Sequence, residues 1–104
     1  MNDATPVIAA LAGLCQGFSL AQAPGRLDTL ARALLLDSIG CALAARDHAA
    51  VPKAAAAARQ LAPGDAATGL GSGRRYGVLG AILDSGAAIR ALDFNDFYWG
   101  PGIG

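Results

Sequence analysis

The chain has 104 residues, enough for one domain, with no net charge, 54% hydrophobic residues and only 15% charged residues. Its only adjacent basic pair is Arg74 with Arg75, so the sequence lacks the positive patch that nucleic acid or an anionic membrane would need, and we expect neither as a partner. In typical soluble domains about a quarter of the residues are charged. The lower share in this chain indicates that much of its surface contacts other protein.

The first expected helix spans residues 5–18. Thr5 stands where an N-cap belongs, Pro6 occupies the first helical position, and apolar residues then recur at helical spacing. This pattern predicts a short helix with one buried face, on which Cys15 is a buried thiol. The apolar stretch is too short to span a bilayer and follows polar residues instead of basic ones, so we expect no secretory signal and a cytoplasmic protein.

The second expected helix spans residues 23–46 and has the most regular apolar spacing of the chain. Asp28 and Arg32 stand four residues apart on its exposed side and are expected to form an ion pair. Asp37 lies among leucines, so we expect a partly buried carboxylate that caps a helix or pairs with an arginine, with a catalytic role as the alternative. Cys41 is expected to be buried.

The single histidine and the two cysteines do not form a metal site in this sequence. His48 lies between two expected helices and is predicted to be a solvated loop residue. Cys15 and Cys41 lack the spacing of a zinc site or a redox pair. We therefore expect no metal and no other cofactor.

A third helix is expected over residues 51–64, and a glycine-rich segment, residues 65–77, follows it. Proline near the start and Pro-Gly at the end delimit the helix, and its alanines let neighbouring helices approach closely. The glycines predict a turn cluster or a short extended segment. Arg74 occupies a position at which a dinucleotide-binding loop needs glycine. Two interpretations remain for the segment: a plain connection, or a backbone nest that binds an anionic group with help from Arg74 and Arg75.

The last expected helix spans residues 76–94 and is rich in small residues, which suits a helix packed among others. Asp93 and Asp96 then lie at its C-terminus or just beyond, where carboxylates oppose the helix dipole, so stability does not explain their position. They face the same side if the last turn stays helical. Paired carboxylates beside aromatic residues can provide a catalytic base; the alternative is a polar loop that caps the helix.

The predicted fold is all-α, with about four helices and a glycine-rich turn or extended segment between the third and the fourth.

The order of these motifs resembles the opening of the MmgE/PrpD family, which includes 2-methylcitrate dehydratase and cis-aconitate decarboxylase. The matching stretches are "LLLDSIGCALAA" (34–45), "TGLGSGRR" (68–75), "AILDSGAAIRALDFND" (81–96) and "FYWGPGIG" (97–104). They cover nearly the whole chain, and "GAAIRALDFND" is the most specific of them. The resemblance implies a large helical domain with a smaller α/β domain, a homodimer, no metal, and chemistry on small tricarboxylic and dicarboxylic acids.

The resemblance also implies that residues 1–104 are an incomplete N-terminal portion of the helical domain. Chains of the family are several times longer, and a His-Pro-Ser segment with an active-site histidine is expected directly after the last motif. The remainder of the chain is therefore an expected partner, and the 104 residues alone are expected to be inactive.

Site residues follow from the resemblance position by position. Asp93 and Asp96 match the two aspartates of the family's Asp-Phe-Asp/Asn-Asp segment and are the expected catalytic residues. Arg90 and Phe97 are the expected substrate-binding residues. Phe97 would form an aromatic wall together with Phe94, Tyr98 or Trp99, and Arg90 would bind substrate carboxylates, with a solvated arginine on the helix face as the alternative. The decarboxylase branch has threonine where Phe97 stands, so the sequence favours dehydration of 2-methylcitrate or a similar hydroxy acid. An isomerase, an epimerase or a decarboxylase of the same family, and a free-standing helical interaction module, remain as alternatives.

Overall fold

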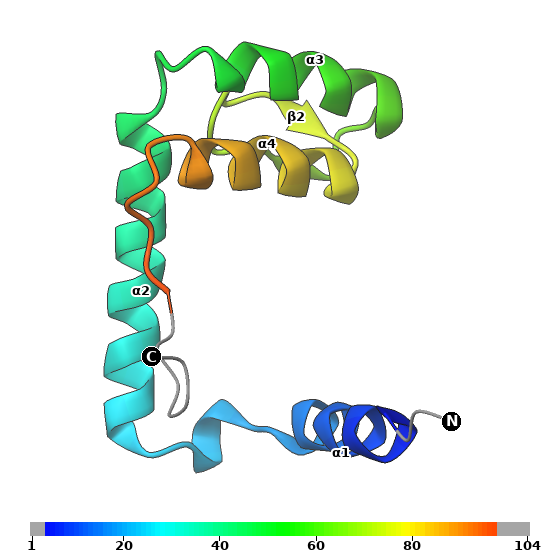
Figure 1. The fold of residues 1–104 in the computed structure, drawn as a ribbon, viewed down its shortest axis with the longest axis vertical. Coiled ribbons are helices and arrows are strands. Elements are labelled where there is room, and N and C mark those ends of the chain that lie inside the picture. The colour runs from blue at the N-terminus through cyan, green and yellow to red at the C-terminus, as the bar shows by residue number, and fades with distance from the viewer. Residues whose placement is uncertain (1–3, 98–104) are drawn as a thin grey trace. The chain divides into compact units, whose positions relative to one another are not determined.

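The computed structural model of the chain describes residues 4–97, and its contacts divide the chain into two units, Met1–Arg32 and Ala33–Gly104. The elements in chain order are α1 (Ala4–Gly17), the short 3-10 helix η1 (Leu20–Gln22), α2 (Gly25–Ala44), α3 (Ala50–Leu61), β1 (Ala67–Thr68), β2 (Arg75–Tyr76) and α4 (Val78–Arg90). The mostly α-helical fold, with a short extended segment between α3 and α4, is as predicted (Figure 1). None of the helices within residues 4–97 combines the length and the apolar character that crossing a membrane requires.

Helix α1 forms where the sequence predicts a helix, one residue earlier than expected, but the predicted buried face is wrong. Its apolar side chains are exposed, among them Val7 at 61% and Leu14 at 66%. Cys15 is exposed as well, which corrects its assignment as a buried thiol. The physical reason is that, among residues 4–32 of this unit, no other element covers the apolar stripe.

Helix α2 is slightly shorter than the predicted 23–46. The expected ion pair is present, with 2.9 Å between Arg32 Nε and Asp28 Oδ2. Asp37 is exposed and makes no ion pair with any residue in the range 4–97, so the prediction of a partly buried, paired carboxylate is wrong. The leucines beside it are themselves exposed, Leu36 at 72%, so nothing shields this carboxylate from water. Cys41, further along the helix, is buried as predicted.

The core of the second unit contains many alanines, which let α3 and α4 pack directly against each other (Figure 1). One cluster of buried residues joins Ala42, Val51 and Ala88, with Ile89 packed against it. A second cluster joins Ala58, Tyr76 and Ala81, with Ala67 packed against it. The alanine-rich sequence of α3 therefore serves close packing, as expected.

The glycine-rich segment forms an antiparallel hairpin. Ala67 pairs with Tyr76 and Thr68 pairs with Arg75. Gly73, at the tip, has a φ of +72°, a conformation that side chains disfavour. The extended segment predicted between the third and fourth helices is thus a two-stranded hairpin that leads directly into α4.

Helix α4 ends at Arg90, four residues before the end of the expected helix 76–94. The amide of Ala91 donates to the carbonyl of Ala88 over 3.3 Å, which tightens the last turn. Asp93 then takes a left-handed conformation with a φ of +57°. The last turn is not helical at Asp93, so the helical geometry that would align Asp93 and Asp96 is absent.

Candidate functional site

A carboxylate on α4 holds the hairpin loop in place. Asp84 is completely buried, and its Oδ1 accepts hydrogen bonds from the backbone amides of Gly71, over 2.8 Å, and Ser72, over 3.1 Å. Its Oδ2 accepts a bond of 2.5 Å from the Ser72 hydroxyl and one of 3.0 Å from the Tyr76 hydroxyl. Four donors therefore surround this buried carboxylate, which compensates the loss of its hydration.

The glycines of the loop make this arrangement possible. A Cβ at Gly69 would overlap the carboxyl group of Asp84, and a Cβ at Gly71 would lie 2.9 Å from the Cβ of Ala88. A second bond fastens the loop beside them, because the Leu70 amide donates to the Ser85 hydroxyl over 3.0 Å. Close approach of the loop backbone to α4 thus requires glycine at both positions.

The loop does bind an anionic group through its amides, but the anion belongs to the chain itself. This arrangement differs from both predicted interpretations, a plain connection and a nest that binds an anion with help from Arg74 and Arg75, because the acceptor is Asp84 of α4. Arg75, one of the two arginines of the predicted nest, pairs with the Asp65 carboxylate and also donates to the Asp65 carbonyl over 2.6 Å. The amides of Gly71 and Ser72 are therefore engaged, and an external anion would need other donors.

The predicted catalytic residues lie in the segment that follows α4. Arg90 joins two of its residues: its Nη2 lies 3.4 Å from Asp93 Oδ1, and its Nη1 donates to Asn95 Oδ1 over 3.0 Å. The side chains of Arg90 and Asp93 remain 65% and 84% exposed. The structure thus brings Arg90, Asp93 and Asn95 together at the surface.

Asp96 and the aromatic residues complete this segment. The Asp96 side chain is exposed, and its backbone carbonyl accepts a hydrogen bond of 3.0 Å from Asn95 Nδ2. Phe94 and Phe97 are also exposed. The Cys41 thiol lies 3.9 Å from the Phe94 carbonyl, which connects this segment with α2. Tyr98 and Trp99, which with Phe94 and Phe97 are the aromatic residues of the segment expected to form walls around the substrate, lie outside the described residues.

The left-handed backbone of Asp93 is the most unusual feature of this segment. For L-residues this conformation costs about 1–2 kcal/mol, although aspartate and asparagine tolerate it better than most. Strained residues concentrate at functional sites, where the surrounding structure maintains them. The bond of 3.1 Å from the Asp93 amide to the Arg90 carbonyl helps to maintain this one.

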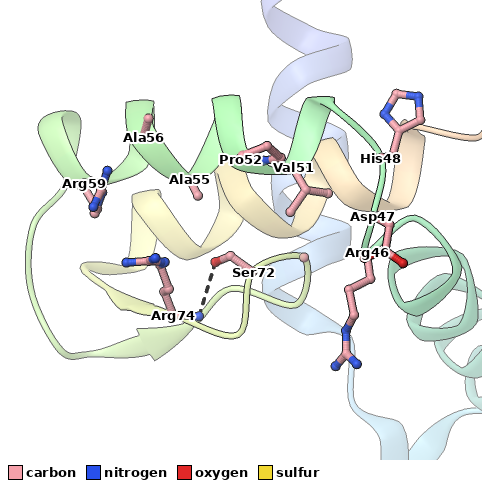
Figure 2. Close-up of a pocket in the computed structure, with 11 residues that line it drawn as sticks. Arg46, Asp47, His48, Val51, Pro52, Ala55, Ala56, Arg59, Ser72 and Arg74 are labelled. Carbon is pink, nitrogen blue, oxygen red and sulfur yellow. Dashed lines mark hydrogen bonds between the residues drawn. The ribbon is translucent and has the colours of Figure 1, made fainter.

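A separate pocket of about 590 Å³ lies between α3, the turn before α3 and the hairpin loop (Figure 2). Its lining comprises Arg46, Asp47, His48, Val51, Pro52, Ala55, Ala56, Arg59, Gly71, Ser72 and Arg74. His48 is exposed, as predicted, and its Nδ1 accepts a hydrogen bond of 3.1 Å from the amide of Ala50, the first residue of α3.

Sequence reasoning missed Asp84, which accepts hydrogen bonds from the hairpin loop, and Arg59, which lines the pocket. The spacing of Ala81, Asp84 and Ala88 places the carboxylate on the same helical stripe as two buried alanines, which was a usable signal. Arg59 stands four residues after Ala55, so the spacing alone also predicts that they share a face of α3.

Comparisons with known proteins add one finding. The family model described as the MmgE/PrpD N-terminal domain matches residues 9–104. The match includes α2, the hairpin, α4 and all four predicted site residues. Comparisons with curated proteins and with solved structures give no significant match.

Proposed function

The chain belongs to the MmgE/PrpD family, whose N-terminal domain matches residues 9–104, and from this premise we propose that it is the N-terminal part of a metal-independent lyase. The proposed reaction is the dehydration of 2-methylcitrate or a similar hydroxy tricarboxylic or dicarboxylic acid by acid and base catalysis. A homodimer and a cytoplasmic location are parts of the same proposal. The family match is the observation that carries it.

Asp93 is the proposed base. Its carboxylate is 84% exposed, so a substrate can approach it without displacement of other side chains. Arg90 uses one nitrogen toward Asp93 and another toward Asn95, and a guanidinium has five N–H donors in all. Arg90 can therefore bind a substrate carboxylate while it positions Asp93, and Asp96 supplies a second carboxylate within the same segment.

The proposed reaction breaks two bonds of the substrate. Asp93 removes the proton from the carbon next to a carboxylate, and the electron pair of that C–H bond forms the carbon–carbon double bond. The C–O bond of the hydroxyl group breaks, and the oxygen leaves as water after it takes a proton from an acid. We propose that this acid is a histidine in the segment that follows residue 104 in the family. Each positioned acid or base contributes about 10² to 10⁴-fold to the rate.

Phe97 favours dehydration over decarboxylation within the family, since the decarboxylase branch has threonine at this position. An exposed phenylalanine beside the two carboxylates can exclude water once substrate or another part of the protein covers it. The family match also favours an enzyme over a free-standing helical interaction module.

Replacement of Asp93 tests the proposal in the natural protein that contains this chain. Asp93→Asn removes the base but keeps a residue that tolerates the left-handed backbone, whereas alanine would add strain. We expect kcat on 2-methylcitrate to fall about 10² to 10⁴-fold, with an unchanged melting temperature. Formation of the conjugated double bond, followed by ultraviolet absorbance and by NMR of the product, is the measurement.

The matched control is Asp28→Asn. Like Asp93, Asp28 is an exposed carboxylate paired with an arginine a few residues away, so its replacement removes the same charge far along the chain from Asp93. Normal kcat is expected for this control. A kcat within threefold of the natural enzyme for Asp93→Asn would remove Asp93 from the mechanism, and a product without a double bond would point to isomerisation instead.

A further inference from the structure

The pocket between α3 and the hairpin loop has one strongly cationic end. Arg59, from the last turn of α3, and Arg74, from the hairpin, lie there, and Arg74 extends from the loop toward α3 (Figure 2). Asp47, the one acidic residue of the lining, lies at the opposite end beside Arg46 and His48 (Figure 2). Three arginines and one aspartate make the lining positive by two charges, in a chain whose net charge is zero.

Helical spacing explains how the sequence forms this pocket. Pro52, Ala55, Ala56 and Arg59 stand at steps of three, one and three residues, so they share one stripe of α3. The two alanines leave the depression open, because their side chains are short. Arg59 then closes one end of the depression with a long cationic side chain. The stripe thus combines an apolar floor with a charged rim.

The backbone that carries Arg74 is held in a defined place. Its amide donates to the Ser72 hydroxyl over 3.2 Å, and the same hydroxyl donates to buried Asp84. Arg59 is part of a regular helix. Both arginines therefore project from backbone that hydrogen bonds hold in place, which favours a binding site at this end of the pocket.

Neither arginine has an acidic partner within residues 4–97. The ion pairs of this region engage Arg32, Arg75 and Arg90, each with an aspartate. Arg59 and Arg74 thus bring two positive charges to one end of a pocket, an arrangement that repels unless an anion lies between them. A guanidinium presents paired N–H donors that match the oxygens of carboxylate and phosphate groups.

We propose that this end of the pocket binds a small multivalent oxyanion, a dicarboxylate, tricarboxylate or phosphate compound, between Arg59 and Arg74. A pocket of about 590 Å³ is large enough for such a molecule. Val51, Pro52 and Ala55 offer apolar contact to a carbon skeleton. The pocket lining does not include Arg90, Asp93, Asp96 or Phe97. This site is therefore additional to the proposed active site.

Isothermal titration calorimetry on the natural protein, at constant ionic strength, tests the proposal with citrate and inorganic phosphate as probes. Charge-assisted hydrogen bonds of this kind are strong, so we expect Arg59→Gln and Arg74→Gln each to weaken binding about tenfold. The double variant should lose the binding event of this pocket, while citrate can still bind at the proposed active site. Arg26→Gln is the matched control, since Arg26 is an exposed arginine outside the pocket lining. Both arginines of the site are exposed, so unchanged circular dichroism is expected for all variants.

The outcomes separate this proposal from the dehydratase proposal. Binding of citrate alone identifies a carboxylate site, and binding of phosphate identifies a phosphate site; either supports the inference if it is sensitive to Arg59 and Arg74. Asp93→Asn should leave this binding event unchanged even when turnover is lost. The inference fails if the natural protein binds neither probe, if Arg26→Gln weakens binding as much as Arg59→Gln, or if Asp93→Asn abolishes the event.

Discussion

Asp84→Ala is expected to destabilise the second unit more than any surface substitution. The change removes a carboxylate that accepts four hydrogen bonds, two from the backbone amides of Gly71 and Ser72 and two from the hydroxyls of Ser72 and Tyr76. The carboxylate itself is completely buried. Its donors therefore lose their partner in a place where water does not replace it readily.

The magnitude follows from what is left without a partner. A buried donor without an acceptor costs about 1–3 kcal/mol, and the two hydroxyls lose charge-assisted bonds in addition, so we expect a loss of about 3–5 kcal/mol. Asp84→Asn is the milder variant, since its amide oxygen can still accept from both backbone amides while its NH₂ donates to a hydroxyl. For this variant we expect about 1–2 kcal/mol. Native stabilities are about 5–15 kcal/mol, so the alanine variant loses a large share.

Urea unfolding with linear extrapolation measures both losses, and amide hydrogen exchange adds a local measurement. Exchange at Gly71 and Ser72 should accelerate in Asp84→Ala and remain slow in Asp84→Asn. A loss below about 1 kcal/mol for the alanine variant, with unchanged exchange at these two amides, would refute the reasoning that Asp84 holds the loop.

Two glycines of α4 make a matched pair for a second stability test. Gly86 has open space where a Cβ would lie, so Gly86→Ala should stabilise the protein by about 0.5–1 kcal/mol, whereas a Cβ at Gly80 would lie 2.8 Å from the Tyr76 Cβ, so Gly80→Ala should destabilise it by about 1–3 kcal/mol. Thermal unfolding distinguishes the two variants. Equal shifts of their melting temperatures would contradict the close contact of Gly80 with Tyr76. His48→Ala should cost about 0.5–1 kcal/mol, because the amide of Ala50 loses its acceptor, while His48→Asn restores one; equal stability of both variants would argue against this cap.

The sequence predicted the helices and the turn or extended segment between α3 and α4 well, because their signals are local. Proline and alanine at the start of α3, glycines in residues 69–77 and apolar spacing in α2 act through neighbours a few residues away. The ion pair of Asp28 with Arg32 was predicted for the same reason, as the helix alone sets its geometry.

Burial was predicted less well, because it depends on surfaces that are distant in sequence. Their apolar neighbours led us to expect a buried Cys15 and a partly buried Asp37, but those neighbours are exposed in the structure. Hydrophobic spacing shows which face could be covered, and it does not show whether another element covers it. The expected aromatic walls depend on distant surfaces in the same way, and Phe97 is exposed.

By itself, the sequence determined the family, the order of the elements and the segment that contains Asp93 and Asp96, since each of these rests on short motifs. The tertiary structure decided that Asp84 binds the amides of the glycine-rich loop, and that Arg59 and Arg74 share one pocket. Each of these arrangements joins residues more than ten positions apart. Packing of α3, the hairpin and α4 places these residues close together, and no local sequence pattern specifies that arrangement.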